Sequence, residues 1–190
     1  MDSFAYPPQF SDQVLARPAR VLFVGDGQMA SKHVRAFAAQ PDANICGVVG
    51  SSRTQVKAFA EKHLIPDYGT DLSAGYEATQ PDLIVAAVSV PAVSEVYTEL
   101  FIFDATLLLE KPFGLDLRES QALQHLAQAA GAKAFVAMNR RQYANLRYAR
   151  QRLSLDTSVR LVQILDQESF DHPIAAGWPS SIIEKWMYGN

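Results

Sequence analysis

The chain contains very little cysteine and no strong excess of charge of either sign. Its single cysteine, Cys46, excludes an internal disulfide, so nothing indicates a secreted scaffold held together by such bonds. The 17 basic residues nearly balance the 20 acidic residues, and the sequence therefore predicts no nucleic-acid partner and no binding to an anionic membrane. The four histidines lie far apart, which leaves no spacing typical of a metal site.

Long hydrophobic runs are also absent. The longest, from Leu83 to Val93, is interrupted by Ser89 and Pro91 and is too short to cross a bilayer. The first residues include an aspartate and two prolines and do not resemble a signal peptide. Apolar residues nevertheless make up 48% of 190 positions, which is enough for a core. We therefore expect a soluble, cytoplasmic, mixed globular protein with one full domain and a remainder.

Short apolar runs alternate with helical patterns through most of the chain. This alternation is typical of βαβ units and predicts an α/β fold with a doubly wound parallel sheet. The expected strands are residues 21–24, 45–49, 83–88, 106–109 and 135–138. The expected helices are residues 29–39, 56–63, a segment from 93 onward, and 116–130.

The pattern predicts three segments. Residues 1–19 contain three prolines and are expected to form an extended leader, and residues 20–150 form the α/β domain. Residues 151–190 are expected to begin a second, incomplete α+β domain, with a strand-like run at 159–165 and little regular periodicity from 171 onward. Aromatic residues such as Trp178 in this tail favour an interface, so homo-oligomer contacts are expected there. The basic helical pattern at 140–153 is expected to be a solvated face, and the alternative is a contact with an anionic substrate or cofactor.

A glycine turn carries the strongest chemical signal. Residues 25–30 fit G-x-G-x-x-[GA] between an expected strand and an expected helix, which is the context in which the motif binds a dinucleotide. Gly25 would allow the tight turn, and Gly27 would let the backbone approach a diphosphate. The diphosphate would then lie on the free N–H groups of the helix that begins near Gln28 and Met29. The alternative is a turn that needs glycine for its geometry alone.

The end of the second expected strand bears on the kind of dinucleotide. Folds that prefer NAD usually place an acidic residue there to bind the ribose hydroxyls, but no acidic residue occurs between Asp42 and Glu61. Ser51, Ser52 and Arg53 could instead bind a 2′-phosphate through charge-assisted hydrogen bonds. The serines could equally cap the second helix. The sequence thus favours NADP as cofactor, with NAD as the alternative.

Two opposite charges, Glu110 and Lys111, follow the apolar run 106–109. Ligands in open α/β sheets bind beyond the carboxyl ends of the strands, so both residues are expected to face a cofactor crevice. A lysine desolvated there can exchange a proton with a substrate oxygen. Pro112 would fix the local turn and is compatible with a cis peptide bond. The alternative is a surface ion pair that opens a loop.

The glycine turn and the Glu-Lys-Pro sequence together resemble the Gfo/Idh/MocA-type NAD(P)-dependent oxidoreductases, over residues 20–152. His33 and the segment 139–141 also look like parts of the family pattern. The resemblance implies a Rossmann domain followed by a larger α/β domain with an open antiparallel sheet. By the same resemblance, Lys111 binds the reacting hydroxyl and assists its proton transfer, and Glu110 lies near the nicotinamide ribose. His33 is expected to serve packing rather than catalysis.

The sequence departs from this family at two places. The family usually has Thr-Pro followed four residues later by histidine, whereas here Ser89 and Pro91 are the candidates for cofactor contacts and Glu95 takes the place of the histidine. The family's Asp-x-x-x-His motif, which supplies an acid/base histidine, does not occur after Arg152. Asp171 and His172 are adjacent and cannot share one helix face at that spacing.

The function expected from this resemblance is hydride transfer between a nicotinamide and a carbon that bears oxygen. The expected substrate is a small molecule of the sugar, cyclitol or polyol kind, and the chain is expected to be a truncated oxidoreductase. Because the second-domain motif is absent, the sequence leaves open whether this chain turns a substrate over. The alternative function is a non-catalytic dinucleotide-binding sensor or partner-binding module.

Overall fold

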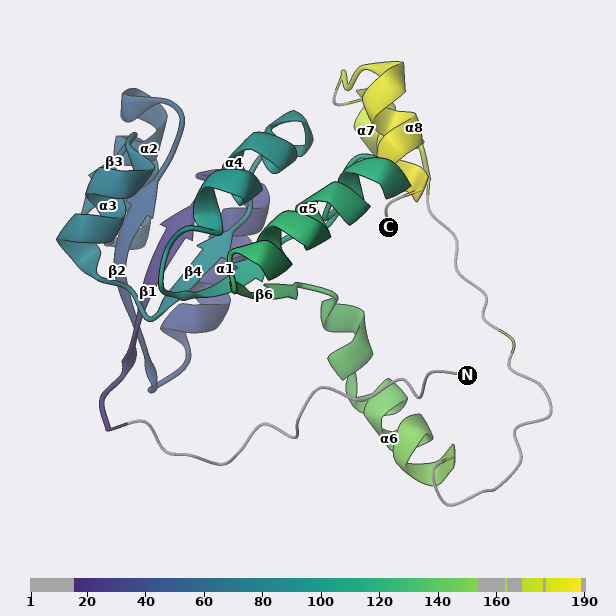
Figure 1. Cartoon of the computed structure of the whole chain (residues 1–190), viewed down its shortest axis with the longest axis horizontal. Coiled ribbons are helices and arrows are strands. Elements are labelled where there is room, and N and C mark those ends of the chain that lie inside the picture. Colours follow the sequence, from purple (N-terminus) through teal and green to yellow (C-terminus); the bar gives the residue numbers. More distant parts are fainter. Residues whose placement is uncertain (1–15, 154–162, 164–168, 176, 189–190) are drawn as a thin grey trace.

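Residues 16–153, 163, 169–175 and 177–188 are described by the structure, a computed structural model. Its centre is a six-stranded parallel sheet with the strand order β3-β2-β1-β4-β5-β6 (Figure 1). The strands are β1 (Ala19–Val24), β2 (Ala43–Val49), β3 (Tyr68–Gly69), β4 (Leu83–Ala86), β5 (Thr106–Leu109) and β6 (Lys133–Val136). This order is that of the Rossmann fold, and it confirms the doubly wound α/β prediction.

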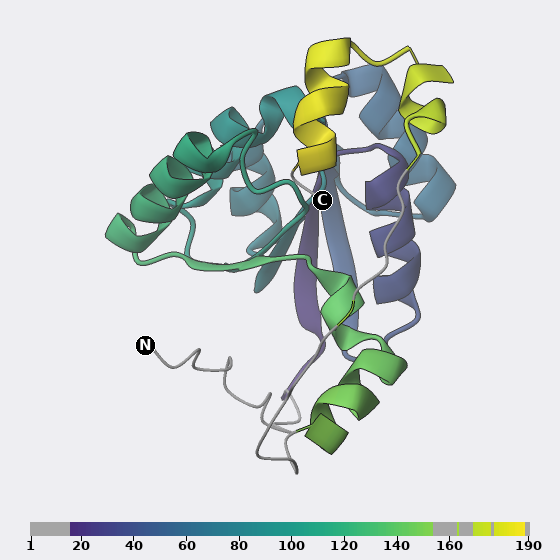
Figure 2. The same ribbon diagram turned by 90° about the vertical axis from the view of Figure 1, so that its right-hand side faces the viewer.

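Helices cover both faces of the sheet. The described helices are α1 (Gln28–Ala38), α2 (Arg53–His63), α3 (Leu72–Thr79), α4 (Val93–Leu100), α5 (Leu117–Ala129), α6 (Ala144–Leu153), α7 (Asp171–Ala175) and α8 (Ser180–Tyr188), with short 3-10 turns η1 (Val90–Ala92) and η2 (Asn139–Gln142). Figure 2 shows α5 and α1 on opposite sides of the sheet. None of the described helices is long and apolar enough to span a membrane.

The core is divided between these two faces because side chains alternate along each strand. In β1, Val21 and Phe23 pack with α1 and α2, whereas Leu22 and Val24 pack with α3, α4 and α5. Strands that are apolar on both faces in this way read as continuous hydrophobic runs. The central strands therefore stand out in the sequence, and their ends position the carboxyl edge of the sheet.

Two elements of the fold were not predicted from the sequence. The edge strand β3 has only two residues, and α3 is a short helix with Gly75 in its interior, so neither produces a clear periodic pattern. Asp71 caps α3, accepting a hydrogen bond from the Ala74 N–H at 2.7 Å. The strands β4 and β6 also end two residues earlier than expected, at Ala86 and Val136.

The C-terminal tail corrects another expectation. Little regular structure was expected from residue 171 onward, but the structure forms α7 and α8 there. Pro173 lies in the first turn of α7, where a proline is tolerated. Ile183 of α8 is buried, and α8 packs near η1. The predicted strand at 159–165 lies outside the described residues apart from Gln163. In contrast, α6 is exposed along its whole length, as expected for a solvated face.

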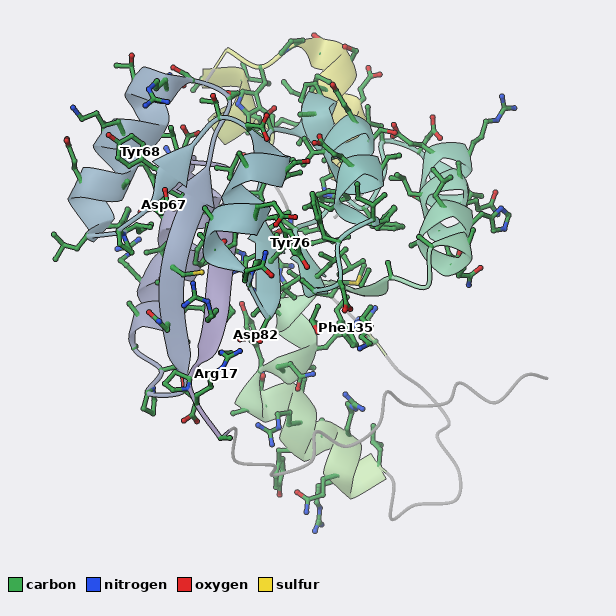
Figure 3. All side chains as sticks on the ribbon, turned by 60° about the vertical axis from the view of Figure 1, so that its left-hand side comes forward. Arg17, Asp67, Tyr68, Tyr76, Asp82 and Phe135 are labelled. Atoms are coloured by element: carbon green, nitrogen blue, oxygen red, sulfur yellow. The ribbon has the colours of Figure 1, made fainter. Side chains whose placement is uncertain are left out.

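The amino-terminal edge of the sheet is held by an ion pair. The Arg17 guanidinium donates to both carboxylate oxygens of Asp82, at 2.7 and 2.9 Å (Figure 3). Asp82 also accepts from the Arg20 N–H at 2.8 Å. These hydrogen bonds hold the pKa of Asp82 below its usual value, with the Arg17 contact as the largest cause. The end of the expected leader is thus tied to the strand edge, and β1 itself begins at Ala19.

Candidate functional site

The turn between β1 and α1 needs glycine at its first position for two reasons. Gly25 has φ = +107°, a conformation that other residues rarely adopt. A Cβ atom on Gly25 would also lie 2.2 Å from the carbonyl oxygen of Ala87, which follows β4. The Gly25 N–H donates to the Val49 carbonyl at 2.8 Å, so the turn is fixed to both neighbouring strands.

Gly27 is different, because the protein itself does not require glycine there. It is the N-cap of α1, with φ = −86°, and a Cβ atom on it would meet no atom of the described residues within 4 Å. In the part of the chain that the structure describes, no side chain caps this helix, so its first N–H groups lack the usual side-chain acceptor. Gln28 and Met29 are exposed in this first turn, whereas Ala30 is fully buried against the sheet. The arrangement leaves a bare backbone facing open space, which fits an anionic ligand.

Asp26, between the two glycines, lies against the end of β2. Its Oδ2 atom is buried and has no hydrogen-bond partner among the described residues. A Cβ atom on Gly50 would lie 2.7 Å from this oxygen. Asp26 and Gly27 also line an open hollow of about 450 Å³, together with residues of α2 that include Lys62. A carboxylate with an unused acceptor thus borders an accessible space beside the glycine turn.

The polar segment after β2 divides into two roles. Ser52 is the N-cap of α2, and its Oγ accepts a long hydrogen bond from the Gln55 N–H at 3.5 Å. Ser51 and Arg53 are exposed, and Arg53 is the first residue of α2. The alternative in which serine caps the second helix therefore holds for Ser52, while Ser51 and Arg53 stay available to a ligand.

Glu110 lies at the end of β5 and is 7% exposed. Its Oε1 accepts from His33 Nε2 at 2.8 Å, and its Oε2 accepts from the Lys111 N–H at 2.9 Å. Burial raises the pKa of Glu110, but these two hydrogen bonds and the nearby charges outweigh it, so its pKa lies below the usual value. The expected packing role of His33 is thus a specific one, since it joins α1 to the end of β5.

Tyr97 of α4 supports the same strand end from the other face of the sheet. Its hydroxyl donates to the Glu110 carbonyl at 2.6 Å, and its side chain is fully buried. Burial and the Glu110 charge both raise the pKa of Tyr97 far above its usual value, so the hydroxyl stays protonated. Phe113 stacks on the Tyr97 ring with a centroid distance of 6.2 Å.

Lys111 is exposed at this edge, in contrast to the buried Glu110. The peptide bond between Lys111 and Pro112 is cis, and Pro112 is buried. The two opposite charges predicted for this strand end are therefore separated: Glu110 faces inward to His33, while Lys111 is accessible from outside. Such an accessible ammonium group beside a fixed strand end can bind a substrate oxygen.

Ser89 and Pro91 lie at η1, between β4 and α4. Both are exposed, and the Ser89 carbonyl accepts from the Ala92 N–H at 2.9 Å. The helix α4 that follows is anchored by Val93 and Tyr97, both buried. The candidate residues after β1, β2, β4 and β5 thus all lie at the carboxyl edge of one sheet, where open α/β folds bind their ligands.

No metal centre occurs in the part of the chain that the structure describes, where no group of three or more His, Cys, Asp or Glu side chains comes together. Cys46 is buried in β2, and its thiol donates to the Val21 carbonyl at 3.2 Å. Burial raises the pKa of the Cys46 thiol, which makes it unsuited to be a nucleophile.

The strand order and the glycine turn define an NAD-binding Rossmann domain. The chain belongs to the Gfo/Idh/MocA oxidoreductase family: residues 19–138 match the family model described as "Oxidoreductase family, NAD-binding Rossmann fold". The match covers the glycine turn, Glu110 and Lys111, and it confirms the resemblance seen in the sequence.

Solved structures with the same fold include several dehydrogenases. A protein described as an NADPH-dependent oxidoreductase from Desulfitobacterium hafniense is 15% identical, with a TM-score of 0.67 over 72% of this chain and 39% of that one. Scyllo-inositol dehydrogenase from Lactobacillus casei, with bound NAD(H) and scyllo-inositol, is 18% identical, with a TM-score of 0.64 over 73% of this chain and 42% of that one. Myo-inositol 2-dehydrogenase from Lactobacillus plantarum is 17% identical, with the same TM-score and coverage. The chain thus spans about two fifths of the length of these proteins.

Sequence reasoning missed three features of the site. The role of Tyr97 left no signal, because a buried tyrosine in a helix looks like any core residue. The contact between His33 and Glu110 joins residues 77 positions apart and depends on the fold. Asp26 did leave a signal, since an acid inside the glycine motif and the lack of one after β2 are both visible in the sequence.

Proposed function

We propose that the chain binds a nicotinamide dinucleotide at the carboxyl edge of its sheet and forms the cofactor-binding half of an oxidoreductase. The observation that carries this proposal is Gly27. Neither its backbone conformation nor its packing requires glycine, yet it stands bare at the uncapped N-terminus of α1. A diphosphate would occupy this space and accept from the free N–H groups of Gln28 and Met29.

When bound, the nicotinamide would supply or accept a hydride. The residues of this chain would orient the substrate and move the proton. Lys111 would donate a hydrogen bond to the reacting oxygen, give it a proton on reduction and take the hydroxyl proton on oxidation. His33 and Tyr97 would hold the strand end at Glu110, and so position Lys111. Ser89 and Pro91 would border the nicotinamide.

The substrate class is part of this proposal. Two similar structures are named for their action on inositols, which supports a polyol or cyclitol substrate. The homo-oligomer contacts through the C-terminal segment and the cytoplasmic location stay predictions from the sequence. The preference for NADP also stays a prediction, resting on Ser51, Ser52 and Arg53, and the unpartnered carboxylate oxygen of Asp26 argues against it.

The second candidate function is a dinucleotide-binding module without turnover. Glu95 favours it, because it stands where the family has a histidine after Ser89 and Pro91, so that contacts around the nicotinamide would differ. Both functions require the cofactor to bind, and they differ only in whether the bound cofactor then exchanges a hydride with a substrate.

Titration of the purified chain with NADH and NADPH, read by nicotinamide fluorescence, tests the proposal. Binding of one or both is expected, and Gly27→Val should weaken it more than tenfold because the added side chain fills the diphosphate space. Failure of the wild-type chain to bind either dinucleotide would refute both functions. Turnover on a panel of inositols and sugar alcohols, lost in Lys111→Ala, separates the enzyme from the silent module.

A further inference from the structure

The unpartnered oxygen of Asp26 is the feature of the site that the proposed function leaves unused. A buried carboxylate oxygen without a donor costs free energy, and in folded proteins such an oxygen almost always has one. Asp26 is only half-buried as a residue and lines the hollow beside the glycine turn. The Oδ2 atom itself is shielded from solvent, so a ligand donor in that hollow reaches it once the Asp26 carboxyl group rotates toward the hollow.

The position of the Asp26 carboxylate indicates which group of the ligand would donate a hydrogen bond to it. Rossmann folds that bind NAD carry an acidic residue about 20 residues after the glycine turn, at the end of the second strand, where it accepts from the adenosine ribose 2′-hydroxyl. Here the second strand ends at Gly50, and no acidic residue lies between Asp42 and Glu61. A Cβ atom on Gly50 would come within 2.7 Å of Asp26 Oδ2. The Asp26 carboxylate thus fills the space that a side chain at the strand end would occupy.

We propose that Asp26, which lies in the glycine turn, recognises the adenosine ribose of the cofactor. Its carboxylate accepts a hydrogen bond from the 2′-hydroxyl, and its negative charge repels a 2′-phosphate at the same place. This inference rests on the proposed function and deepens it, because it makes Asp26 the residue that sets cofactor specificity. It assigns this chain a preference for NADH over NADPH.

The opposing groups are two cations of α2, of which only Lys62 lines this hollow. Arg53 is exposed at the start of α2, Lys62 lines the hollow, and Ser51 is exposed nearby, so a 2′-phosphate would have donors. Ser52 already caps α2. The exposed side chains are hydrated without any ligand, whereas the buried Asp26 oxygen has no donor among the described residues. The structure therefore favours the hydroxyl over the phosphate.

Binding of three probes tests this inference: NADH, NADPH and 2′-deoxy-NADH, which lacks the 2′-hydroxyl of the adenosine ribose. Dissociation constants are measured by nicotinamide fluorescence on the wild-type chain, Asp26→Asn, Asp26→Ala and Arg53→Ala. The matched control is Asp82→Asn, which removes an aspartate charge at the opposite edge of the sheet. Thermal denaturation of each variant checks that it folds.

The wild-type chain should bind NADH about tenfold more tightly than either NADPH or 2′-deoxy-NADH, the effect of one charge-assisted hydrogen bond. Asp26→Asn should bring the NADH and NADPH constants together, because it removes the repulsion. Asp26→Ala should bind NADH and 2′-deoxy-NADH equally. Asp82→Asn should leave every ratio unchanged.

Three results would overturn the inference alone: equal binding of NADH and 2′-deoxy-NADH by the wild-type chain, an unchanged NADH-to-NADPH ratio in Asp26→Asn, or tighter binding of NADPH that Arg53→Ala abolishes. The first of these needs no variant, so a substitution that failed to fold would not leave the question open. If the wild-type chain binds none of the three probes, the proposed function fails together with the inference.

Discussion

The aspartates at the two edges of the sheet differ in whether their carboxylates have hydrogen-bond partners. At the amino edge, Asp82 is exposed and accepts three hydrogen bonds, two from Arg17 and one from the Arg20 N–H. At the carboxyl edge, Asp26 is half-buried, and its inner oxygen has no partner among the described residues. The exposed carboxylate, which water could solvate, is satisfied by the protein, while the buried oxygen is left without a donor.

This difference indicates that the polar groups of the amino edge stabilise the fold, whereas those of the carboxyl edge are placed to bind a ligand. At the amino edge, the Asp82 carboxylate obtains its hydrogen bonds from the chain itself. The carboxyl edge leaves an uncapped helix, a bare glycine and an unpartnered acceptor close together. An edge of this kind is more stable with a ligand than without one, because the ligand supplies the missing partners.

The largest expected effect comes from the two glycines of one turn. Gly25→Ala should lower the free energy of unfolding by about 2–4 kcal/mol, because it combines a left-handed φ with a contact to the Ala87 carbonyl. Gly27→Ala is the matched control and should cost less than about 1 kcal/mol, since only the cap preference changes. Urea denaturation measures both. Equal losses in the two variants would mean that Gly27 also serves the fold.

The next largest effect on stability is expected from removing the Tyr97 hydroxyl, which donates to the Glu110 carbonyl. Tyr97→Phe should lower the free energy of unfolding by about 1–3 kcal/mol, because it leaves the carbonyl after β5 without its donor in a buried place. Tyr76→Phe is the matched control: its hydroxyl makes a long 3.4 Å bond to the Asp104 carbonyl near the surface (Figure 3). Chemical denaturation should show little change for the control, and a similar loss in both would contradict a special role for Tyr97.

The hydrogen bond between His33 and Glu110 predicts a smaller effect on stability that depends on pH. Because the pKa of Glu110 is lowered by folding, its ionised form contributes stability that is complete above the ordinary value and is lost as pH falls below about 4.5. The stability of Glu110→Gln should therefore fall less steeply than that of the wild type on acidification through this range. Parallel stability curves for the two proteins between about pH 5 and pH 3 would contradict this assignment.

The smallest effect is expected at the amino edge. Asp82→Asn breaks an exposed ion pair, which contributes little in water, and should lower the melting temperature less than Tyr97→Phe does. High salt should reduce the difference between wild type and variant further. Cofactor binding by this variant should equal that of the wild type. Weakened binding would show that the two edges of the sheet are energetically coupled.

The central part of the fold was predictable because its strands are apolar on both faces. Continuous runs such as residues 21–24 mark strands covered by helices on either side, and the glycine turn marks the first crossover. The strand β3 was not predictable, because two residues cannot show a period. The helix α8 left a signal that was missed: after Pro179, Trp186 follows Ile182 and Ile183 at the i+4 and i+3 spacing of a helix.

The candidate site was predictable to the extent that it is local in sequence. The turn residues and the Glu-Lys-Pro segment are contiguous motifs, and the structure brings them to one edge because parallel strands all end there. Partners across the fold could not be read from the sequence. The contact of His33 with Glu110, and the placement of Asp26 over Gly50, depend on how α1, β2 and β5 lie side by side.

The strand order has a consequence for how the domain forms. The first strand pairs with β2, and also with β4, whose residues come about 60 positions later in the chain. The Gly25 turn lies against the Ala87 carbonyl, and Ala87 in turn donates to the Val24 carbonyl at 2.8 Å. During synthesis, therefore, the glycine turn at residues 25–30 is completed only when β4 has been made. Closing the long loop between β1 and β4 slows folding. The turn at Gly25 becomes a complete binding turn only after the residues up to Ala87 have been translated.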